Sequence, residues 1–182
     1  VSQAVDKLGK LYKANLLNQD YYVVGDNLKT GNSANNAVDL SQALLDSDGN
    51  AWAEDQNYKV AGAYLDSETS NYSVYTYMKN DNGDVISVRK STWNTQFEFQ
   101  DTVEADPVEL IALETSNGVK RDLSGDGFVG FKVLASKSID GYQGVTEARV
   151  AGDTPFWLVG DAVKQGSKSN PLSLKNALLN ED

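Results

Sequence analysis

The chain has 182 residues and a formal net charge of −10, from 16 basic and 26 acidic side chains. This length is enough for one domain with a sizeable core or for two small ones, and a hydrophobic content of 40% indicates a globular protein. The acidic excess argues against nucleic-acid binding, because affinity for phosphate comes mostly from Lys and Arg.

The chain contains neither Cys nor His. This composition excludes disulfides, zinc thiolate sites and thiol nucleophiles, and it excludes the Ser-His-Asp and Cys-His arrangements of common hydrolases. No apolar run approaches the roughly 18 residues of a membrane span. We therefore expect no enzyme, with no catalytic or cofactor-binding residues. A hydrolase using two carboxylates is the remaining catalytic alternative, and it needs acidic groups about 5 to 9.5 Å apart.

The predicted strands pair as hairpins. Alternating aromatic and β-branched residues flank short polar linkers, and the linker at residues 80–84 carries an Asn-Gly turn signal. The linker at residues 18–20 joins the first hairpin, and a similar hairpin recurs late in the chain. The fold class that we predict is mainly β (α+β), with antiparallel sheets built from hairpins. The predicted strands span residues 10–17, 21–24, 72–78, 85–88, 146–150 and 156–159.

One short helix is predicted over residues 107–116. Asp106 is a favourable N-cap, Pro107 suits the first helical position and Glu109 completes a capping box. Asn117-Gly118 supplies a stop signal. This helix leads directly into a loop of the calcium-binding type.

The loop places oxygen side chains at alternate positions ahead of a glycine, as in D-x-[DN]-x-[DN]-G cation loops. Val133 stands where an EF-hand has a bidentate Glu, so we expect a further carboxylate from elsewhere. Glu114 is the candidate, because an anion at a helix C-terminus is unfavourable without a nearby cation. The alternative is a Gly-rich turn that binds nothing. The candidate metal ligands are Asp122, Ser124, Asp126, the carbonyl of Phe128, and Glu114, and the expected ion is Ca²⁺.

The chain is similar to itself at a long offset. Residues 24–31 align with residues 159–166 at an offset of 135, and residues 43–45 align with residues 177–179 at an offset of 134. Self-similarity at a fixed offset indicates a repeat architecture, and this period is too long for one turn of a solenoid.

We therefore predict a single domain over residues 1–182. Within it, the internal repeat at residues 8–48 is matched by residues 143–182 around a central region at residues 51–130.

Several of these segments together form a recognisable string of motifs. They are Tyr21–Val24, Gly49–Trp52, Tyr72–Tyr75, Asn80–Gly83, Leu113-Glu114 and Asp122–Gly130. The string resembles the tryptophan-rich Synechocystis-type C-terminal repeat family of cyanobacterial proteins, with Tyr75 in place of a Trp and Ser124 in place of the usual Asn. The resemblance implies a secreted or cell-surface repeat module that is attached to larger exoproteins and has no established enzymatic activity of its own.

Three further features have two interpretations each. Residues 46–50 can be interpreted as a second cation loop or as a plain turn. Four acidic residues ahead of the helix can be interpreted as an acid and base pair of carboxylates or as part of a solvated loop. An aromatic set is a platform for sugars or part of the core. The acidic residues are Glu98, Asp101, Glu104 and Asp106. The aromatic residues are Trp52, Tyr58, Tyr64, Tyr72, Tyr75, Tyr77 and Trp93.

We expect a non-enzymatic, calcium-stabilised module with a structural or display role. Weak calcium sites are typical of extracellular modules, so the predicted location is extracellular or the cell surface. The expected partners are a calcium ion and neighbouring repeats of a longer chain, because the sequence begins at Val1 rather than Met. A carbohydrate-binding or adhesion module, with a surface polysaccharide as partner, is the alternative.

Overall fold

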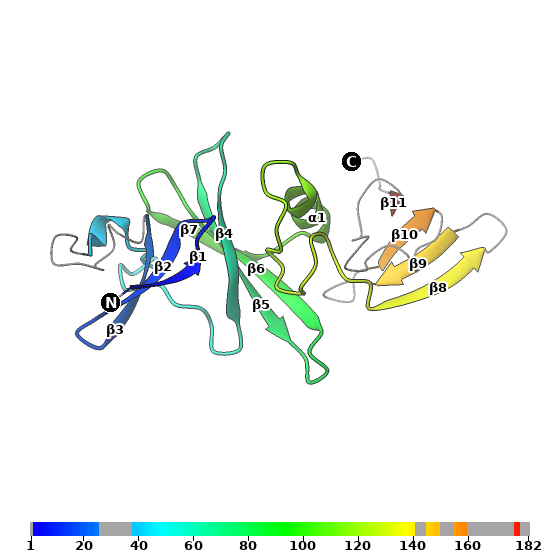
Figure 1. Cartoon of the computed structure of the whole chain (residues 1–182), viewed down its shortest axis with the longest axis horizontal. Helices are drawn as coiled ribbons and strands as arrows, with labels where there is room; N and C mark the ends of the chain where they lie inside the picture. The colour runs from blue at the N-terminus through cyan, green and yellow to red at the C-terminus, as the bar shows by residue number, and fades with distance from the viewer. Residues whose placement is uncertain (1, 26–37, 141–144, 150–154, 160–176, 179–182) are drawn as a thin grey trace. The chain divides into compact units, whose positions relative to one another are not determined.

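The computed structural model describes residues 2–25, 38–140, 145–149, 155–159 and 177–178. Their order in the chain is three strands, a short 3-10 helix, four strands, an α-helix and four strands (Figure 1). The mainly β class with one short α-helix is confirmed. The elements are β1 (Ser2–Asp6), β2 (Leu11–Leu16), β3 (Gln19–Val24), η2 (Leu40–Gln42), β4 (Lys59–Leu65), β5 (Tyr72–Lys79), β6 (Val85–Trp93), β7 (Phe99–Glu104), α1 (Pro107–Thr115), β8 (Ala135–Asp140), β9 (Val145–Arg149), β10 (Pro155–Val159) and β11 (Ala177–Leu178).

The strands form three sheets, with the orders β1-β2-β3, β4-β5-β6-β7 and β11-β10-β9-β8. The chain divides into two compact units, one of Val1–Thr76 with Arg89–Val103 and the other of Tyr77–Val88 with Glu104–Asp182. The single domain over residues 1–182 stays a prediction.

The first hairpin differs from the prediction in its turn. β2 and β3 pair up to Leu16 opposite Gln19, so the turn is Leu17-Asn18 and not residues 18–20. Both turn residues have positive φ, 51° and 65°, as a two-residue hairpin turn that follows the strand twist requires. Leu17 gives no such signal in the sequence, because a left-handed conformation normally favours Gly, Asn or Asp.

The second hairpin, β5 and β6, is confirmed. The backbone N–H of Asn80 donates to the carbonyl of Asp84, and the Asn80 side-chain oxygen accepts from Asn82 N and Asp84 N, each at 3.0 Å. Gly83 has a φ of 82°, which L side chains rarely adopt. The Asn-Gly signal therefore placed this turn correctly.

The helix is also confirmed, with a small difference at its end. The Asp106 carboxylate accepts hydrogen bonds from Val108 N and Glu109 N, so it caps the first turn as predicted. The helix ends at Thr115, and Ser116 is already extended with a ψ of 151°. Because the helix stops there, the Asn117-Gly118 signal lies just beyond its end.

The segment ahead of the helix was wrongly predicted as a loop. Residues 99–104 form β7, although most of their side chains are exposed. The hydroxyls of Ser91 and Thr102 lie 2.7 Å apart, which ties β6 to β7. Exposure explains the error, because a strand with a polar surface lacks the apolar alternation that identifies strands. The strands β1, β4, β8 and β11 were likewise absent from the prediction.

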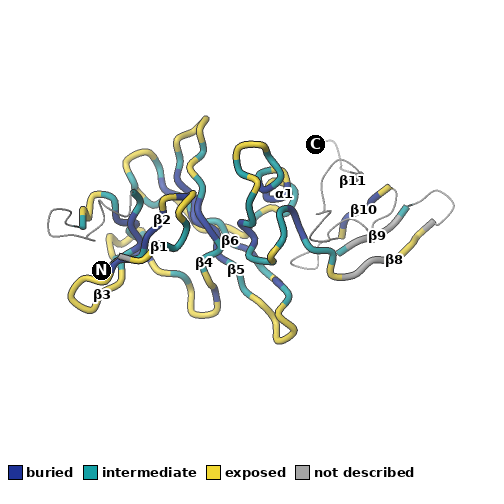
Figure 2. Tube along the Cα trace, in the orientation of Figure 1, coloured by how far each residue is buried: buried dark blue, intermediate teal, exposed yellow. Residues whose placement is uncertain are grey.

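Aromatic side chains form the core of the first unit. Trp52 packs edge-on against Tyr22 and Trp93, with ring centroids 5.2 and 5.3 Å apart. The indole N–H of Trp93 donates to the carbonyl of Leu45 at 2.8 Å, so this buried donor is satisfied. Figure 2 shows the buried positions running along the strands and the exposed ones at the turns. The core interpretation is confirmed for the buried aromatics Trp52, Tyr58, Tyr72, Tyr75 and Trp93.

Replacing a core tryptophan should cost far more stability than replacing an exposed one. Trp52 is 7% exposed and Trp157 is 41% exposed. We expect Trp52→Ala to lower the free energy of unfolding by about 3 to 5 kcal/mol, because it leaves a cavity. Trp157→Ala should lower it by less than about 1 kcal/mol. Urea unfolding followed by circular dichroism measures both, and equal losses would contradict this account of the core.

Candidate functional site

The predicted metal loop follows α1 in the second unit, and its central contact is a buried carboxylate. Glu114 is 0% exposed, although a glutamate side chain in water is ordinarily charged. Its Oε1 accepts hydrogen bonds from Leu123 N at 2.6 Å and Ser124 N at 2.7 Å, and its Oε2 accepts from Gly130 N at 2.8 Å. One side chain of the helix therefore holds the loop at both its beginning and its end.

Asp122 organises the middle of the loop in the same way. Its Oδ1 accepts from Gly125 N at 2.6 Å and from the Ser124 hydroxyl at 3.1 Å. Its Oδ2 accepts from Gly127 N at 2.8 Å. Short polar side chains that accept from the following backbone form tight turns of this kind.

Asp126 fixes the exit of the loop. Its Oδ1 accepts from Phe128 N and its Oδ2 from Lys132 N, both at 2.8 Å. Glu114, Asp122 and Asp126 thus accept three, two and two backbone N–H groups respectively. The loop is folded around its carboxylates, and their position is set by the backbone.

The carboxylates sit in an environment that disfavours their charged forms. The pKa of Glu114 is raised to about 8, first by burial and then by the charges of Asp122 and Asp126, against the opposing effect of the N–H groups of Leu123 and Gly130. Burial also raises the pKa of Asp126 to about 6, with a smaller contribution from the charge of Asp122. The three acidic groups are therefore close enough to repel one another, and a nearby cation would reduce this repulsion.

Gly125 makes the tight loop possible. Its φ is 76°, and a Cβ at this position would overlap the ring of Tyr77 from β5. The loop therefore packs its backbone directly on an aromatic side chain. Gly125 is not the glycine of the cation-loop motif, which is Gly127, and it has two reasons of its own to be there, its conformation and this close approach.

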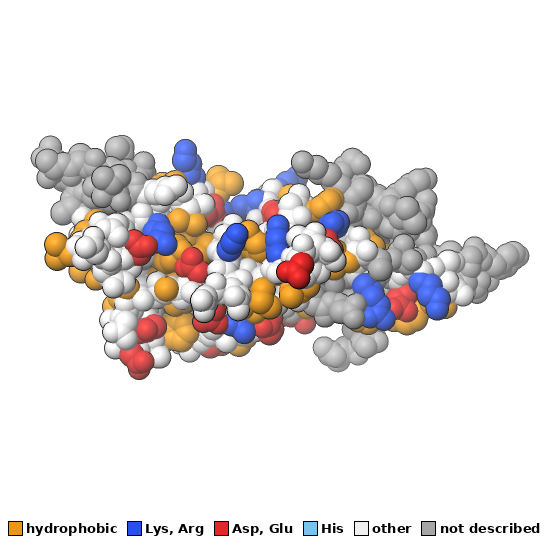
Figure 3. Space-filling view, turned by 90° about the horizontal axis from the view of Figure 1, so that it is seen from below, with side chains coloured by type: hydrophobic (Ala, Val, Ile, Leu, Met, Phe, Trp, Pro, Cys, Tyr) orange, Lys and Arg blue, Asp and Glu red, His pale blue; other side chains and the backbone are white. Residues whose placement is uncertain are grey.

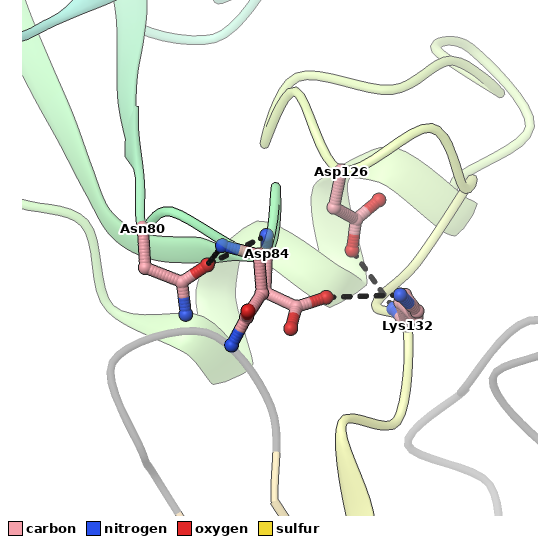
Figure 4. Close-up of polar contacts among 5 residues, drawn as sticks. Asn80, Asp84, Asp126 and Lys132 are labelled. Atoms are coloured by element: carbon pink, nitrogen blue, oxygen red, sulfur yellow. Dashed lines mark hydrogen bonds and ion pairs between the residues drawn. The ribbon is translucent and has the colours of Figure 1, made fainter.

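Lys132 connects the loop to the β5–β6 turn. Figure 4 shows its ammonium beside the Asp84 carboxylate, with Nζ 3.0 Å from Oδ1, while its backbone N–H donates to Asp126. A cavity of about 20 Å³ lies here, lined by residues of the turn and of the loop. This volume holds about one water. This ion pair joins residues that are 48 apart in the chain, so no local pattern in the sequence indicates it.

Several carboxylate oxygens of the loop keep acceptor capacity that a hard cation could use, and Glu114 Oε2 is one of them, because it accepts only the N–H of Gly130. Each oxygen of a carboxylate has about two acceptor positions, and Asp122 Oδ2 and both oxygens of Asp126 each accept one N–H group. Glu114 Oε1 already accepts two. Ser124 lies in contact with Asp122, and Phe128 contributes its N–H group to the loop. The ligand roles of all five candidates stay predictions, namely those of Asp122, Ser124, Asp126, the Phe128 carbonyl and Glu114.

A metal site of several converging acidic groups is not formed by the described residues. No three acidic side chains in the described part of the chain gather so that they could hold a metal ion. Cation binding would thus use few charged ligands together with neutral oxygens, and calcium accepts carbonyl, hydroxyl and water oxygens as well as carboxylates. Such a site is expected to be weak.

The second candidate cation loop is a turn. Asp46 Oδ1 accepts from Asp48 N at 2.9 Å and from Asn50 N at 2.8 Å, and Gly49 has a φ of 79°. The turn lies between Leu45 and Ala51, which form an isolated bridge. The turn itself is shown, and a second cation at residues 46–50 stays a prediction.

No family model, curated protein or solved structure matches this chain. The resemblance to the tryptophan-rich repeat family therefore stays a prediction. Within the described residues, no helix has both the length and the apolar character that a membrane crossing needs.

Removing the Glu114 carboxylate should unfold the loop or weaken it severely. Glu114→Ala leaves three buried N–H groups without their acceptor, and each such group costs about 1 to 3 kcal/mol. We expect the free energy of unfolding to fall by at least about 3 kcal/mol, measured by urea titration. Glu109→Ala, an exposed position of the same helix, is the matched control and should cost less than about 1 kcal/mol.

Proposed function

We propose that this chain is a non-enzymatic structural module, extracellular or at the cell surface, whose loop at residues 122–130 is stabilised by calcium. The observation that carries the proposal is the use of the loop carboxylates. Glu114, Asp122 and Asp126 all accept backbone N–H groups and so serve the architecture of the loop. A role in spacing or display requires such a rigid connection between segments.

Calcium would act here as a counter-charge, binding oxygens of Asp122 and Asp126 with Ser124 and Phe128 as further candidates. Its contribution is electrostatic, because two partly buried carboxylates that repel each other are neutralised. The site's few charged ligands predict weak affinity, in the range of about 10⁻⁴ to 10⁻³ M that extracellular modules have. This affinity is the reason for proposing a location outside the cell.

The distribution of charged side chains on the surface is more consistent with a structural role than with a nucleic-acid interface. On the face shown in Figure 3, acidic and basic side chains are interspersed with apolar ones. A nucleic-acid interface instead gathers Lys and Arg on one face. The net charge of −10 points in the same direction.

Chelation should lower the melting temperature of the protein. A ligand that binds only the folded state stabilises it by about 2.7 kcal/mol at 100 times its dissociation constant. We expect a lower melting temperature in EGTA than in saturating calcium, measured by differential scanning calorimetry. Asp126→Asn should abolish this difference, because it removes a carboxylate charge from the loop.

The matched control is Asp101→Asn, which removes an equal charge from the exposed surface of β7. This variant should keep the full difference between calcium and EGTA. If the wild-type protein melts at the same temperature in both solutions, calcium has no part in the function, and only the structural role is left.

A second candidate function, carbohydrate binding, has one observation in its favour. A groove of about 430 Å³ in the first unit combines the rings of Phe97 and Phe99 with the polar groups of Asp46, Gln96 and Glu98. Ligand sites commonly have volumes of about 300 to 1,000 Å³ and combine apolar walls with a few polar groups. This groove, and not the buried aromatics of the core, would meet a sugar.

The groove makes this alternative testable on a glycan array. If carbohydrate binding is the function, the wild-type protein should bind one class of glycan, and Gln96→Ala with Glu98→Gln should reduce the signal at least about tenfold, since both residues are exposed and their loss removes hydrogen bonds to hydroxyls. Glu104→Gln, on exposed β7, is the control. An array without a wild-type signal removes the candidate.

A further inference from the structure

The first and last sheets have the same pairing register. In the first sheet, Ala4 pairs with Tyr12 and Tyr12 with Val23, and in the last, Ser138 pairs with Thr146 and Thr146 with Leu158. The partners therefore correspond strand by strand at offsets of 134 and 135, which are the offsets of the sequence repeat.

The two sheets also share a shift of register and the position of a fourth strand partner. The register shifts between Ala4 and Asp6 in the first sheet and between Ser138 and Asp140 in the last, which are equivalent positions. The fourth strand position agrees as well. Val23 bridges Ala43, and the equivalent Leu158 pairs with Ala177. A shared irregularity is stronger evidence of a common unit than regular pairing, because bulges are specific to a position.

The two sheets differ in what covers one of their faces. Each sheet has two faces. On the face that carries Val23 in the first sheet and the equivalent Leu158 in the last, both side chains are 0% exposed. On the opposite face, Tyr22 is 4% exposed but its equivalent Trp157 is 41% exposed, and Val159 beside it is 45% exposed. Exposed and buried positions alternate along β10 (Figure 2). Among the described residues, Trp157 and Val159 thus lack the cover that Tyr22 has in the first sheet, on a face that also carries Glu147 opposite Trp157 and Lys137 opposite Glu147.

The first sheet shows what kind of partner this face takes. Tyr22 packs against Trp52 and donates its hydroxyl proton to Glu54 at 2.7 Å. Asp6 accepts from Ala63 N at 2.8 Å, and the Tyr72 hydroxyl donates to the carbonyl of Gly9 at 2.6 Å. The cover is therefore a β surface with indole and phenol rings and a carboxylate.

We propose that the Trp157 face of the last sheet is a docking surface for a polypeptide segment with the chemistry of residues 49–134. The inference rests on the proposed role as a repeat module and adds the surface by which one unit joins the next. Trp157 takes the place of Tyr22 and Val159 the place of Val24, which in the first sheet packs against the aromatic core cluster. The occupant supplies aromatic side chains equivalent to Trp52 and Tyr72.

The test extends the full chain with its own middle segment. Asp182 is equivalent to Asp48 at the offset of 134, so a second copy of residues 49–134 follows Asp182 directly, without a linker. Hydrogen exchange of the β9 and β10 amides, measured by mass spectrometry, should slow at least about tenfold relative to the 182-residue chain, because docking suppresses local opening. The fluorescence of Trp157 should shift to shorter wavelength.

The same extended chain carrying Trp157→Asp and Val159→Asp is the control, and it should exchange as fast as the unextended chain. Unchanged exchange in the extended chain overturns the proposal, whether the added segment folds separately or stays unfolded. The calorimetric test of calcium uses the 182-residue chain and a different loop. If EGTA leaves the melting temperature unchanged while the extension protects the β10 amides, the calcium proposal is wrong and the docking surface is supported.

Discussion

The loop that follows α1 depends on one buried carboxylate. Glu114 lies in the last turn of a helix, where a negative charge is unfavourable, and it is removed from water. The N–H groups of Leu123, Ser124 and Gly130 offset only part of both penalties, because the pKa of Glu114 is still raised to about 8. Asp122 and Asp126 accept backbone N–H groups in the same way in the rest of the loop. A compact irregular segment is thereby held by hydrogen bonds from its own backbone to three carboxylates.

The same chemistry recurs at turns elsewhere in the molecule. Asp6, Asp46 and Asp106 each accept backbone N–H groups a few residues further along the chain. Asp66 does so as well, and the N–H of Glu68 holds the pKa of its carboxyl below the ordinary value. Much of the acidic excess thus closes turns. This use accounts for many of the carboxylates among the described residues.

The first unit is organised by aromatic packing. Trp52 contacts Tyr22 from one sheet and Trp93 from another, so a single indole joins segments that are distant in the sequence. The equivalent of Tyr22 in the last sheet is an exposed tryptophan. An apolar ring of that size at the surface is explained if its partner comes from another segment. The two sheets would then be the same structural unit, once with its partner segment and once without it.

The prediction from sequence was accurate where a local rule governs the backbone. The Asn-Gly turn of residues 80–84 and the Asp106 cap depend on a few neighbouring residues, and both are present. It was wrong at the Leu17-Asn18 turn and at β7. In the first case the sheet register imposes a left-handed conformation on a leucine, and in the second a strand has polar side chains and is recognised only by its neighbour.

The sequence by itself determined the mainly β class, the helix, the oxygen-rich loop and the long-range similarity between the two ends of the chain. These features follow from local spacing and from comparison of the chain with itself. Tertiary structure alone decided what the loop carboxylates hold, that Lys132 pairs with Asp84, and that Trp52 is buried whereas Trp157 is exposed. Each of these depends on groups far apart in the chain, because burial and hydrogen-bond partners are properties of the packed molecule and not of a neighbourhood in sequence.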